Sequence, residues 1–274
     1  MFVADAHCDT LYNMAIEKMK PEDVCVTPER MAKGNVCLQT FAMFCSFNRP
    51  DPFQDGMAMK EAYKKLPVRT YNRRLPDEIP TEIGGILSCE GGEMLRGSID
   101  NLCLFDDDVH IRLIALTWNY DNEIATPAYE NAEDGLKPFG FELLREMDAR
   151  GICADTSHLN ERGFWDVIDH ARIAPCASHS NCRWLCDKPR NLKKDQVRAL
   201  IDRKGFIGVN FYSGFLAKDR PALIDDVIAN IDAICSMGGE DIVGFGSDFD
   251  GIEKWPDGLG NPADFPNLIE ALRA

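Results

Sequence analysis

The residues best suited to chemistry come at the start of the chain, where His7 and Asp9 follow the apolar residues Phe2, Val3 and Ala4. Residues two apart in a β-strand point to the same face, so the imidazole of His7 and the carboxylate of Asp9 would reach toward one point. Imidazole and carboxylate are ligand types that zinc and similar divalent ions accept. Taken alone, this pair is better explained as the polar end of an ordinary strand.

Four more residues of the same ligand types stand at the ends of other predicted strands. They are Glu90 after residues 84–89, His158 after 152–157, His179 after 174–178 and Asp248 after 241–246. Of the five histidines, only His110 and His170 lie elsewhere, in polar surroundings that predict surface positions. Six ligand-type residues at strand ends would be an improbable coincidence without a function, so together they predict a metal site.

Six ligands exceed the needs of one tetrahedral zinc ion with an open position. Two ions that share a bridging carboxylate would use them all, and ions about 3.5–4 Å apart can hold a hydroxide and polarise a carbonyl or phosphoryl oxygen. The predicted chemistry is therefore metal-assisted hydrolysis. Two rival site types fit less well. Residues 248–251 lack the remaining ligands of a calcium loop, and Ser157 and Ser178 lack the Gly-x-Ser-x-Gly elbow of a serine nucleophile.

The elements that must position these residues alternate along the chain. Eight apolar segments predict strands, at residues 2–4, 36–44, 84–89, 111–117, 152–157, 174–178, 205–211 and 241–246. Helical patterns cover residues 10–19, 28–33, 57–74, 93–105, 138–150, 160–170, 193–203, 221–237 and 265–274, and loops cover 47–56, 121–136 and 180–192. Alternating strands and helices imply parallel strands, and eight such units predict an α/β fold, a single (β/α)8 TIM barrel over residues 1–274. In that fold, reactive groups lie at the carboxyl ends of the strands.

Composition narrows the classes of partner and compartment. The net charge of −15 argues against nucleic acid or an anionic membrane surface as a partner. Eleven scattered cysteines without paired Cys-x-x-Cys motifs indicate reduced thiols rather than disulfides or zinc knuckles. The N-terminus has no signal-peptide pattern, and no apolar run reaches about 18 residues. These features predict a cytoplasmic protein.

Seven motifs in the chain resemble those of the membrane (renal) dipeptidases, binuclear zinc metallopeptidases of the amidohydrolase kind. In chain order they are Asp5–Thr10, Ser88–Gly92, Gly135–Gly140, Asp155–His158, Ser178–Ser180, Pro189–Asn191 and Gly246–Gly251. They extend over nearly the whole chain, and together they are far more specific than any one of them. The resemblance implies a barrel that holds two zinc ions and hydrolyses dipeptides.

The resemblance also implies how the predicted ligands are shared. The two ions would use His7, Asp9 and Glu90, with Asp248 nearby or ligating, and Glu90, His158 and His179. Glu90 would therefore bridge the ions and be part of the catalytic machinery. A hydroxide between the ions would attack the scissile carbonyl, and Asp248 would carry the proton to the leaving amine.

Two residues are implied to bind the substrate. Arg190 matches the arginine that holds the free carboxylate of the dipeptide, a task that suits a guanidinium because it can form two parallel hydrogen bonds. Trp118 stands where the family often has a substrate-binding histidine. An indole can only donate a hydrogen bond, so Trp118 could be either a donor to the developing oxyanion or a wall of the pocket.

Other expectations concern the chain as a whole. Family members usually continue past the equivalent of Ala274 with further helix, and this chain stops within its last predicted helix. Mammalian members are lipid-anchored, but nothing in this sequence indicates an anchor, so the resemblance is closer to bacterial cytoplasmic members. A homodimer is left open. Two alternative functions also remain: a related binuclear hydrolase that acts on a lactam, lactone or phosphoester, and a non-catalytic relative that binds metal or peptide.

Overall fold

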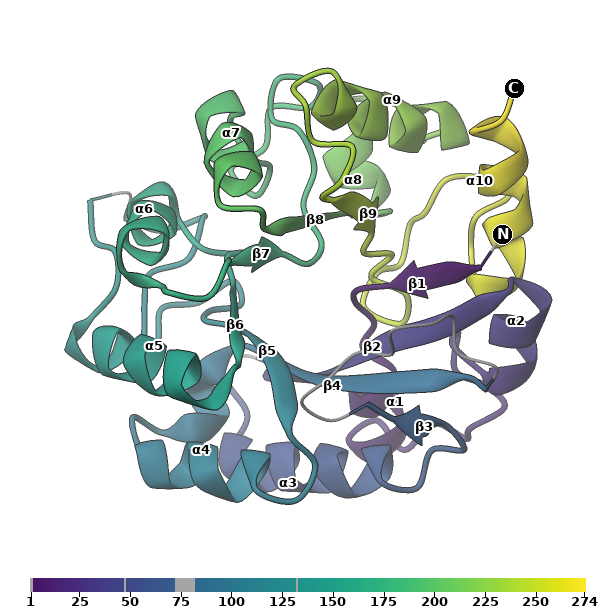
Figure 1. Cartoon of the computed structure of the whole chain (residues 1–274). Helices are drawn as coiled ribbons and strands as arrows, with labels where there is room; N and C mark the ends of the chain where they lie inside the picture. Colours follow the sequence, from purple (N-terminus) through teal and green to yellow (C-terminus); the bar gives the residue numbers. More distant parts are fainter. Residues whose placement is uncertain (1, 47, 72–81, 132) are drawn as a thin grey trace.

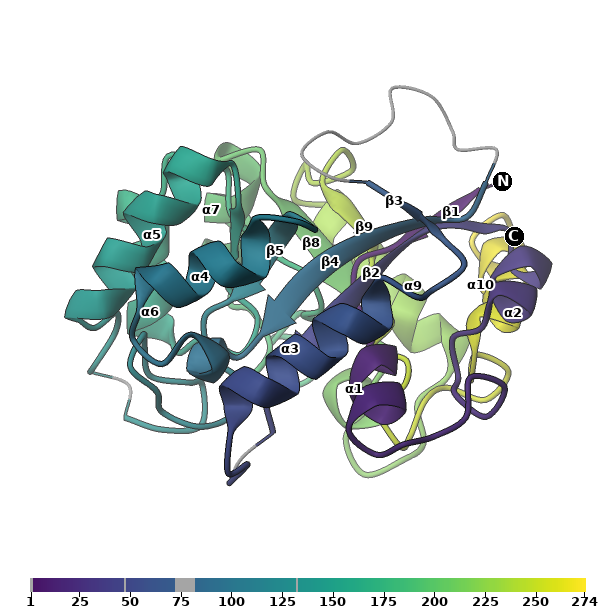
Figure 2. The same ribbon diagram turned by 90° about the horizontal axis from the view of Figure 1, so that it is seen from below.

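Eight parallel strands form the centre of the molecule in the computed structural model, which describes residues 2–46, 48–71, 82–131 and 133–274. The strands are β1 (Val3–Asp5), β2 (Val36–Phe44), β4 (Gly84–Glu90), β5 (Ile111–Ala115), β6 (Cys153–Asp155), β7 (Cys176–Ala177), β8 (Phe206–Val209) and β9 (Val243–Phe245). Figures 1 and 2 show these strands surrounded by helices.

The pairing of the strands closes the sheet into a barrel. The order is β2-β1-β9-β8-β7-β6-β5-β4, and β4 pairs again with β2 from Leu38–Gly84 to Phe44–Glu90. Every residue of β4 is buried, as expected of a strand that has the barrel interior on one face and helices on the other. The predicted (β/α)8 barrel is therefore confirmed.

The helices follow the strands in chain order. They are α1 (Thr10–Ala15), α2 (Pro28–Lys33), α3 (Pro52–Tyr63), α4 (Ile99–Asp106), α5 (Pro138–Arg150), α6 (Glu161–His170), α7 (Lys194–Asp202), α8 (Ser213–Leu216), α9 (Ile224–Cys235) and α10 (Phe265–Ala271), with 3₁₀ helices η1 (Gly92–Leu95) and η2 (Pro262–Asp264). Their ends carry ordinary capping signals. Asn160 accepts a hydrogen bond from the backbone N–H of Gly163 and so starts α6, and Gly151 ends α5 with φ 74°.

Two helix predictions need correction. The helix expected over residues 57–74 begins earlier, because Asp51 caps it by accepting from the Gln54 N–H and Pro52 fits its first turn. It ends at Tyr63, and Arg69–Thr70 form a short strand, β3, beside the start of β4, while residues 72–74 lie outside the described residues. The helix expected over 93–105 is split into η1 and α4, because Arg96 and Gly97 adopt positive φ values of 50° and 62°.

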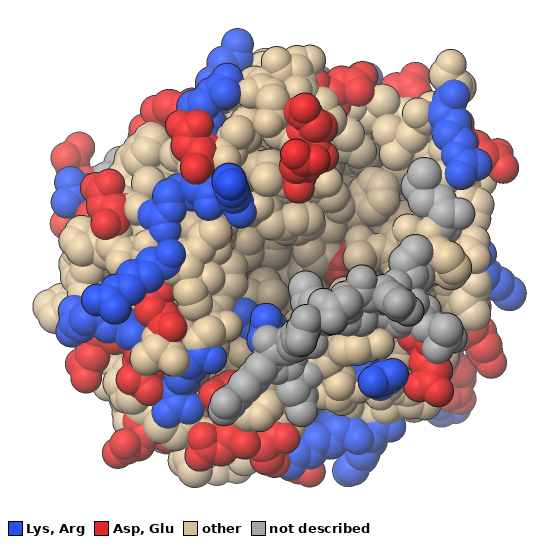
Figure 3. All heavy atoms as spheres, viewed as in Figure 1, with Lys and Arg blue, Asp and Glu red and all other residues tan. Residues whose placement is uncertain are grey.

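The surface carries charges of both signs. Figure 3, viewed as in Figure 1, shows acidic and basic side chains mixed around the edge of this face rather than gathered by sign. Within the described ranges, no helix combines the length and the apolar character needed to cross a membrane.

Candidate metal centre

The carboxyl ends of the strands bring all six predicted ligands into one cluster: His7, Asp9, Glu90, His158, His179 and Asp248. All are buried, with exposed fractions between 0 and 8%. By contrast, His110 and His170 lie outside it. His170 is exposed as predicted, but His110 is half-buried, 3.8 Å from a carboxylate oxygen of Asp106.

Glu90, the last residue of β4, lies at the middle of the cluster. Its Oε2 atom is 3.1 Å from His7 Nε2, which is itself 3.5 Å from Asp9 Oδ2. The other oxygen, Oε1, is 2.9 Å from His158 Nε2 and 3.3 Å from His179 Nε2. Each oxygen of one carboxylate thus faces a different set of ligand atoms, which is the arrangement that a bridging ligand requires.

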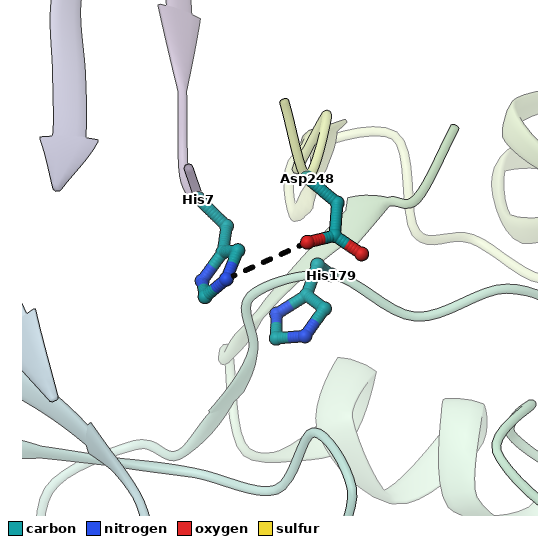
Figure 4. A group of neighbouring side chains, drawn as sticks. All are labelled: His7, His179 and Asp248. Atoms are coloured by element: carbon teal, nitrogen blue, oxygen red, sulfur yellow. Dashed lines mark ion pairs between the residues drawn. The ribbon is translucent and has the colours of Figure 1, made fainter. Parts of the chain in front are cut away.

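Asp248 approaches the cluster from the loop after β9. Figure 4 shows its carboxylate beside His7 and His179, with a dashed line to His7. The Oδ1 atom is 3.8 Å from His7 Nε2, and Oδ2 accepts a 2.8 Å hydrogen bond from Asn210 Nδ2. Because Asn210 holds one oxygen, the other is fixed on the side that faces His7.

Burial and mutual charge shift the pKa values of the carboxyl groups strongly. Burial raises the pKa of Asp248 to about 6, with the charge of Glu90 adding to the effect and His7 opposing it. Burial and the charge of Glu90 also raise the pKa of Asp9 well above its usual value. For Glu90 burial acts upward too, but His7 and the contacts with the three histidines hold its pKa well below the usual value.

The donor set fits divalent cations. Buried carboxylates are stable only with compensating charge or complete hydrogen bonding, and this cluster holds three of them. The Oδ1 atom of Asp9 is buried and has no hydrogen-bond partner in the part of the chain that the structure describes. His158 Nε2 and His179 Nε2 lie 3.0 Å apart and converge on the same Glu90 oxygen. This mixture of nitrogen and oxygen donors suits zinc and other divalent first-row transition metals.

Two cavities adjoin the cluster. One, of about 230 Å³, is lined by Asp9, Glu90 and the aromatic rings of Tyr12 and Phe44. The other, of about 440 Å³, is lined by a different group that includes Tyr129, Tyr212, Phe215 and Lys254. Trp118, His158, Asp248 and Gly251 line both. The two spaces therefore meet at His158 and Asp248, with Trp118 at their boundary.

Trp118 lies at the rim of the site, in the loop that follows β5. Its ring packs edge-on against Phe44 with centroids 4.8 Å apart, and it is 6.4 Å from the ring of His158. The prediction that this side chain reaches the same end of the barrel as the ligands agrees with the geometry. Its part in substrate binding stays a prediction.

Arg190 is buried, although it lies in a loop, and only 3% of its surface is exposed. Its Nη1 donates to Ser180 Oγ and its Nη2 to the carbonyl of His179, over distances of 2.8 and 2.9 Å. The guanidinium has five N–H groups, so three remain, including the Nε group, which has no partner among the described residues. Arg190 lines a third cavity, of about 220 Å³, and its guanidinium carbon lies 5.8 Å from the ring of Phe215 in the 440 Å³ cavity.

Two polar residues of the site were missed in the sequence. Asn210 follows β8 and fixes Asp248, and Asn119 follows Trp118 and contacts His158. Both stand just beyond strand ends, so a search there for amides as well as for metal-ligating types would have found them.

Comparisons with known proteins agree with this geometry. The sequence model of the family described as Membrane dipeptidase (Peptidase family M19) matches residues 1–274. An uncharacterized dipeptidase of Schizosaccharomyces pombe is 31% identical over 200 residues, which are 72% of this chain and 49% of that protein. An uncharacterized protein of the Klebsiella pneumoniae pqqA 5′ region is 38% identical over 174 residues, 60% of this chain and 64% of the other. The chain thus covers less than two thirds of the length of each of these two relatives.

Solved structures share the fold over nearly the whole chain. A Rhodobacter sphaeroides metallo peptidase, liganded with a phosphinate mimic of the dipeptide L-Ala-D-Ala, superposes with a TM-score of 0.89 at 24% identity, over 100% of this chain and 92% of that one. An amidohydrolase from Pseudomonas aeruginosa gives 0.84 at 24% identity, over 99% and 89%. At this identity the likeness shows the fold alone. The match of the family model over residues 1–274 shows that this chain belongs to the membrane dipeptidase family, peptidase family M19.

Proposed function

We propose that this chain is a zinc-dependent dipeptidase with two metal ions. The observation that carries the proposal is Glu90, whose two oxygens face separate ligand sets, His7 at 3.1 Å on one side and His158 and His179 at 2.9 and 3.3 Å on the other. Membership of the membrane dipeptidase family supports the same reaction. When bound, two divalent ions would polarise the scissile carbonyl and activate a water for attack.

The residues of the chain would supply the remaining steps. Asp248 Oδ1 would accept a proton from the attacking water and deliver it to the nitrogen of the leaving amine, as a general base and then a general acid. Its orientation by Asn210 supports this role, since the hydrogen bond to Oδ2 leaves Oδ1 on the ligand side. Burial of the whole cluster would keep bulk water away from the reacting groups.

The shape of the site supports a substrate of two residues. Cavities of about 230 and 440 Å³ meet at the ligands, which gives one space for each side of a scissile bond. Arg190 would bind the free carboxylate through the N–H groups that Ser180 and His179 leave unused. A peptide with a blocked carboxylate should therefore be a poor substrate.

An assay of L,L- and L,D-dipeptides with added zinc, paired with elemental analysis, tests the proposal. We expect hydrolysis that a chelator abolishes and zinc restores, and about two ions per active chain. The matching dipeptide amides should react much more slowly, because they lack the carboxylate. Active protein with a firm content of one ion would refute the binuclear centre. Preferred cleavage of lactams, lactones or phosphoesters, or metal binding without turnover, would favour one of the two alternative functions.

The cytoplasmic location also remains a prediction.

Trp118→Phe separates the two roles that the indole could have. Phenylalanine keeps an aromatic ring between the cavities but removes the N–H donor. If the indole stabilises the developing oxyanion, we expect kcat to fall by about 10²–10³, the usual effect of losing one such donor. If Trp118 is a wall, kcat should stay near the parent value while KM changes. Steady-state kinetics on one dipeptide measures both.

A further inference from the structure

The two histidines that face Glu90 Oε1 are each held from behind through the other ring nitrogen. Their Nε2 atoms lie 3.0 Å apart, and each is within 3.3 Å of Glu90 Oε1. If both nitrogens are bare, three lone pairs converge and repel one another unless a cation lies among them. Which nitrogen of each neutral ring carries the hydrogen therefore decides whether this half of the centre is prepared for a metal ion.

Asn119 holds His158. The Oδ1 atom of Asn119 lies 2.8 Å from His158 Nδ1. An amide oxygen only accepts, so Nδ1 carries the proton and donates it, and Nε2 keeps its lone pair toward Glu90. His158 itself has a positive φ of 67°, and its carbonyl accepts from the Ala128 N–H, so the backbone is fixed while Asn119 fixes the ring.

Asp155 and Ser178 hold His179 in the same way. The Ser178 hydroxyl donates to Asp155, whose Oδ1 also accepts from the N–H groups of Ser157 and Ser178 at 3.0 and 2.9 Å. The single hydroxyl proton is then used, so Ser178 Oγ, 2.7 Å from His179 Nδ1, can only accept from it. Both rings thus present a bare Nε2 to the same point.

We propose that Asn119 is a positioning residue for the metal centre, which sets the tautomer and orientation of His158 for the ion shared by Glu90, His158 and His179. Outer partners of this kind fix the tautomer of a ligand histidine, and their loss typically weakens metal binding by about 10–100-fold. Asn119 lies beside Trp118 on the loop after β5. The proposal therefore predicts that this loop affects the affinity of the site for metal. It rests on the proposed binuclear centre.

The test compares Asn119→Leu, which removes the acceptor at similar size, with Asn119→Asp, which keeps one. Zinc competition against a chelator should show one of the two ions bound about 10–100-fold more weakly in Asn119→Leu, and both bound at least as tightly as in the parent in Asn119→Asp. Asn101→Leu is a matched control, because Asn101 donates to the Leu95 carbonyl in another part of the barrel. Asn119→Ala serves if the leucine variant does not fold.

A second measurement is independent of metal. Histidine nitrogen NMR of the metal-free protein should show His158 as the Nδ1–H tautomer in the parent and in Asn119→Asp, but not in Asn119→Leu. If Asn119→Leu binds both ions like the parent and keeps this tautomer, the role of Asn119 is refuted while the dipeptidase proposal stands. If the parent binds no zinc, the dipeptidase proposal fails and the role of Asn119 toward the ion fails with it, so the zinc content of the parent tells the two failures apart.

Discussion

Glu90→Gln is expected to have the largest effect on this protein. Glutamine has the shape of glutamate, but its amide offers one oxygen and one NH₂ group, so it cannot face both His7 and the His158–His179 pair as a ligand. We expect the zinc content to fall from about two ions to less than one. Losing metal-based stabilisation worth several kcal/mol should lower kcat/KM by roughly 10³-fold or more.

Glu93→Gln provides a matched control for this experiment. Glu93 lies three residues further on, is half-buried, and burial raises the pKa of its carboxyl to about 7. Its Oε1 atom accepts a hydrogen bond from Asn122, and Glu93 is not among the six predicted ligands. The same substitution there should leave zinc content and kcat/KM close to the parent values. Two tightly bound ions in active Glu90→Gln protein would contradict the bridging role.

Asp248→Asn is expected to lower kcat by about 10²–10⁴, the usual range for the loss of a general acid–base group. The amide cannot carry the proton, but it has the same shape and still offers an oxygen to Asn210. Five of the six ligand-type residues remain, so metal content should fall much less than turnover does. Elemental analysis and steady-state kinetics on the same preparation measure the two effects.

Asp257→Asn is the control, since Asp257 is an exposed residue of the same C-terminal loop region. It should match the parent in both measurements. Near-normal turnover in metal-loaded Asp248→Asn protein would show that another group carries the proton.

The sequence determined the barrel and the location of the site because both depend on local patterns. A strand that is buried on both faces must be apolar along its length, as the completely buried β4 shows, and eight such runs separated by helical patterns leave few topologies. All parallel strands carry their carboxyl ends to one side. Residues of ligand type at those ends, such as His7, Glu90 and His179, therefore lie close together in the folded barrel.

Local signals were also present where element boundaries were predicted wrongly. Asp51 and Pro52 form a helix start, but Pro50, Pro52 and Gly56 in the same stretch suggested a loop. The short strand Arg69–Thr70 had no such signal. It exists because its backbone pairs with Gly84 and Gly85 of β4, a contact that no local pattern encodes.

Tertiary structure alone decided how the site residues are oriented. The contacts of Asn119 with His158 and of Asn210 with Asp248 join residues 39 and 38 positions apart. They depend on the register between neighbouring strand ends and on side-chain rotamers. The same holds for Arg190, whose Nη atoms are held by Ser180 and His179. Residue types and spacing can indicate which groups gather at one end of a barrel. Which nitrogen, oxygen or proton faces the centre depends on shifts of about 1 Å, and only the packed structure fixes these.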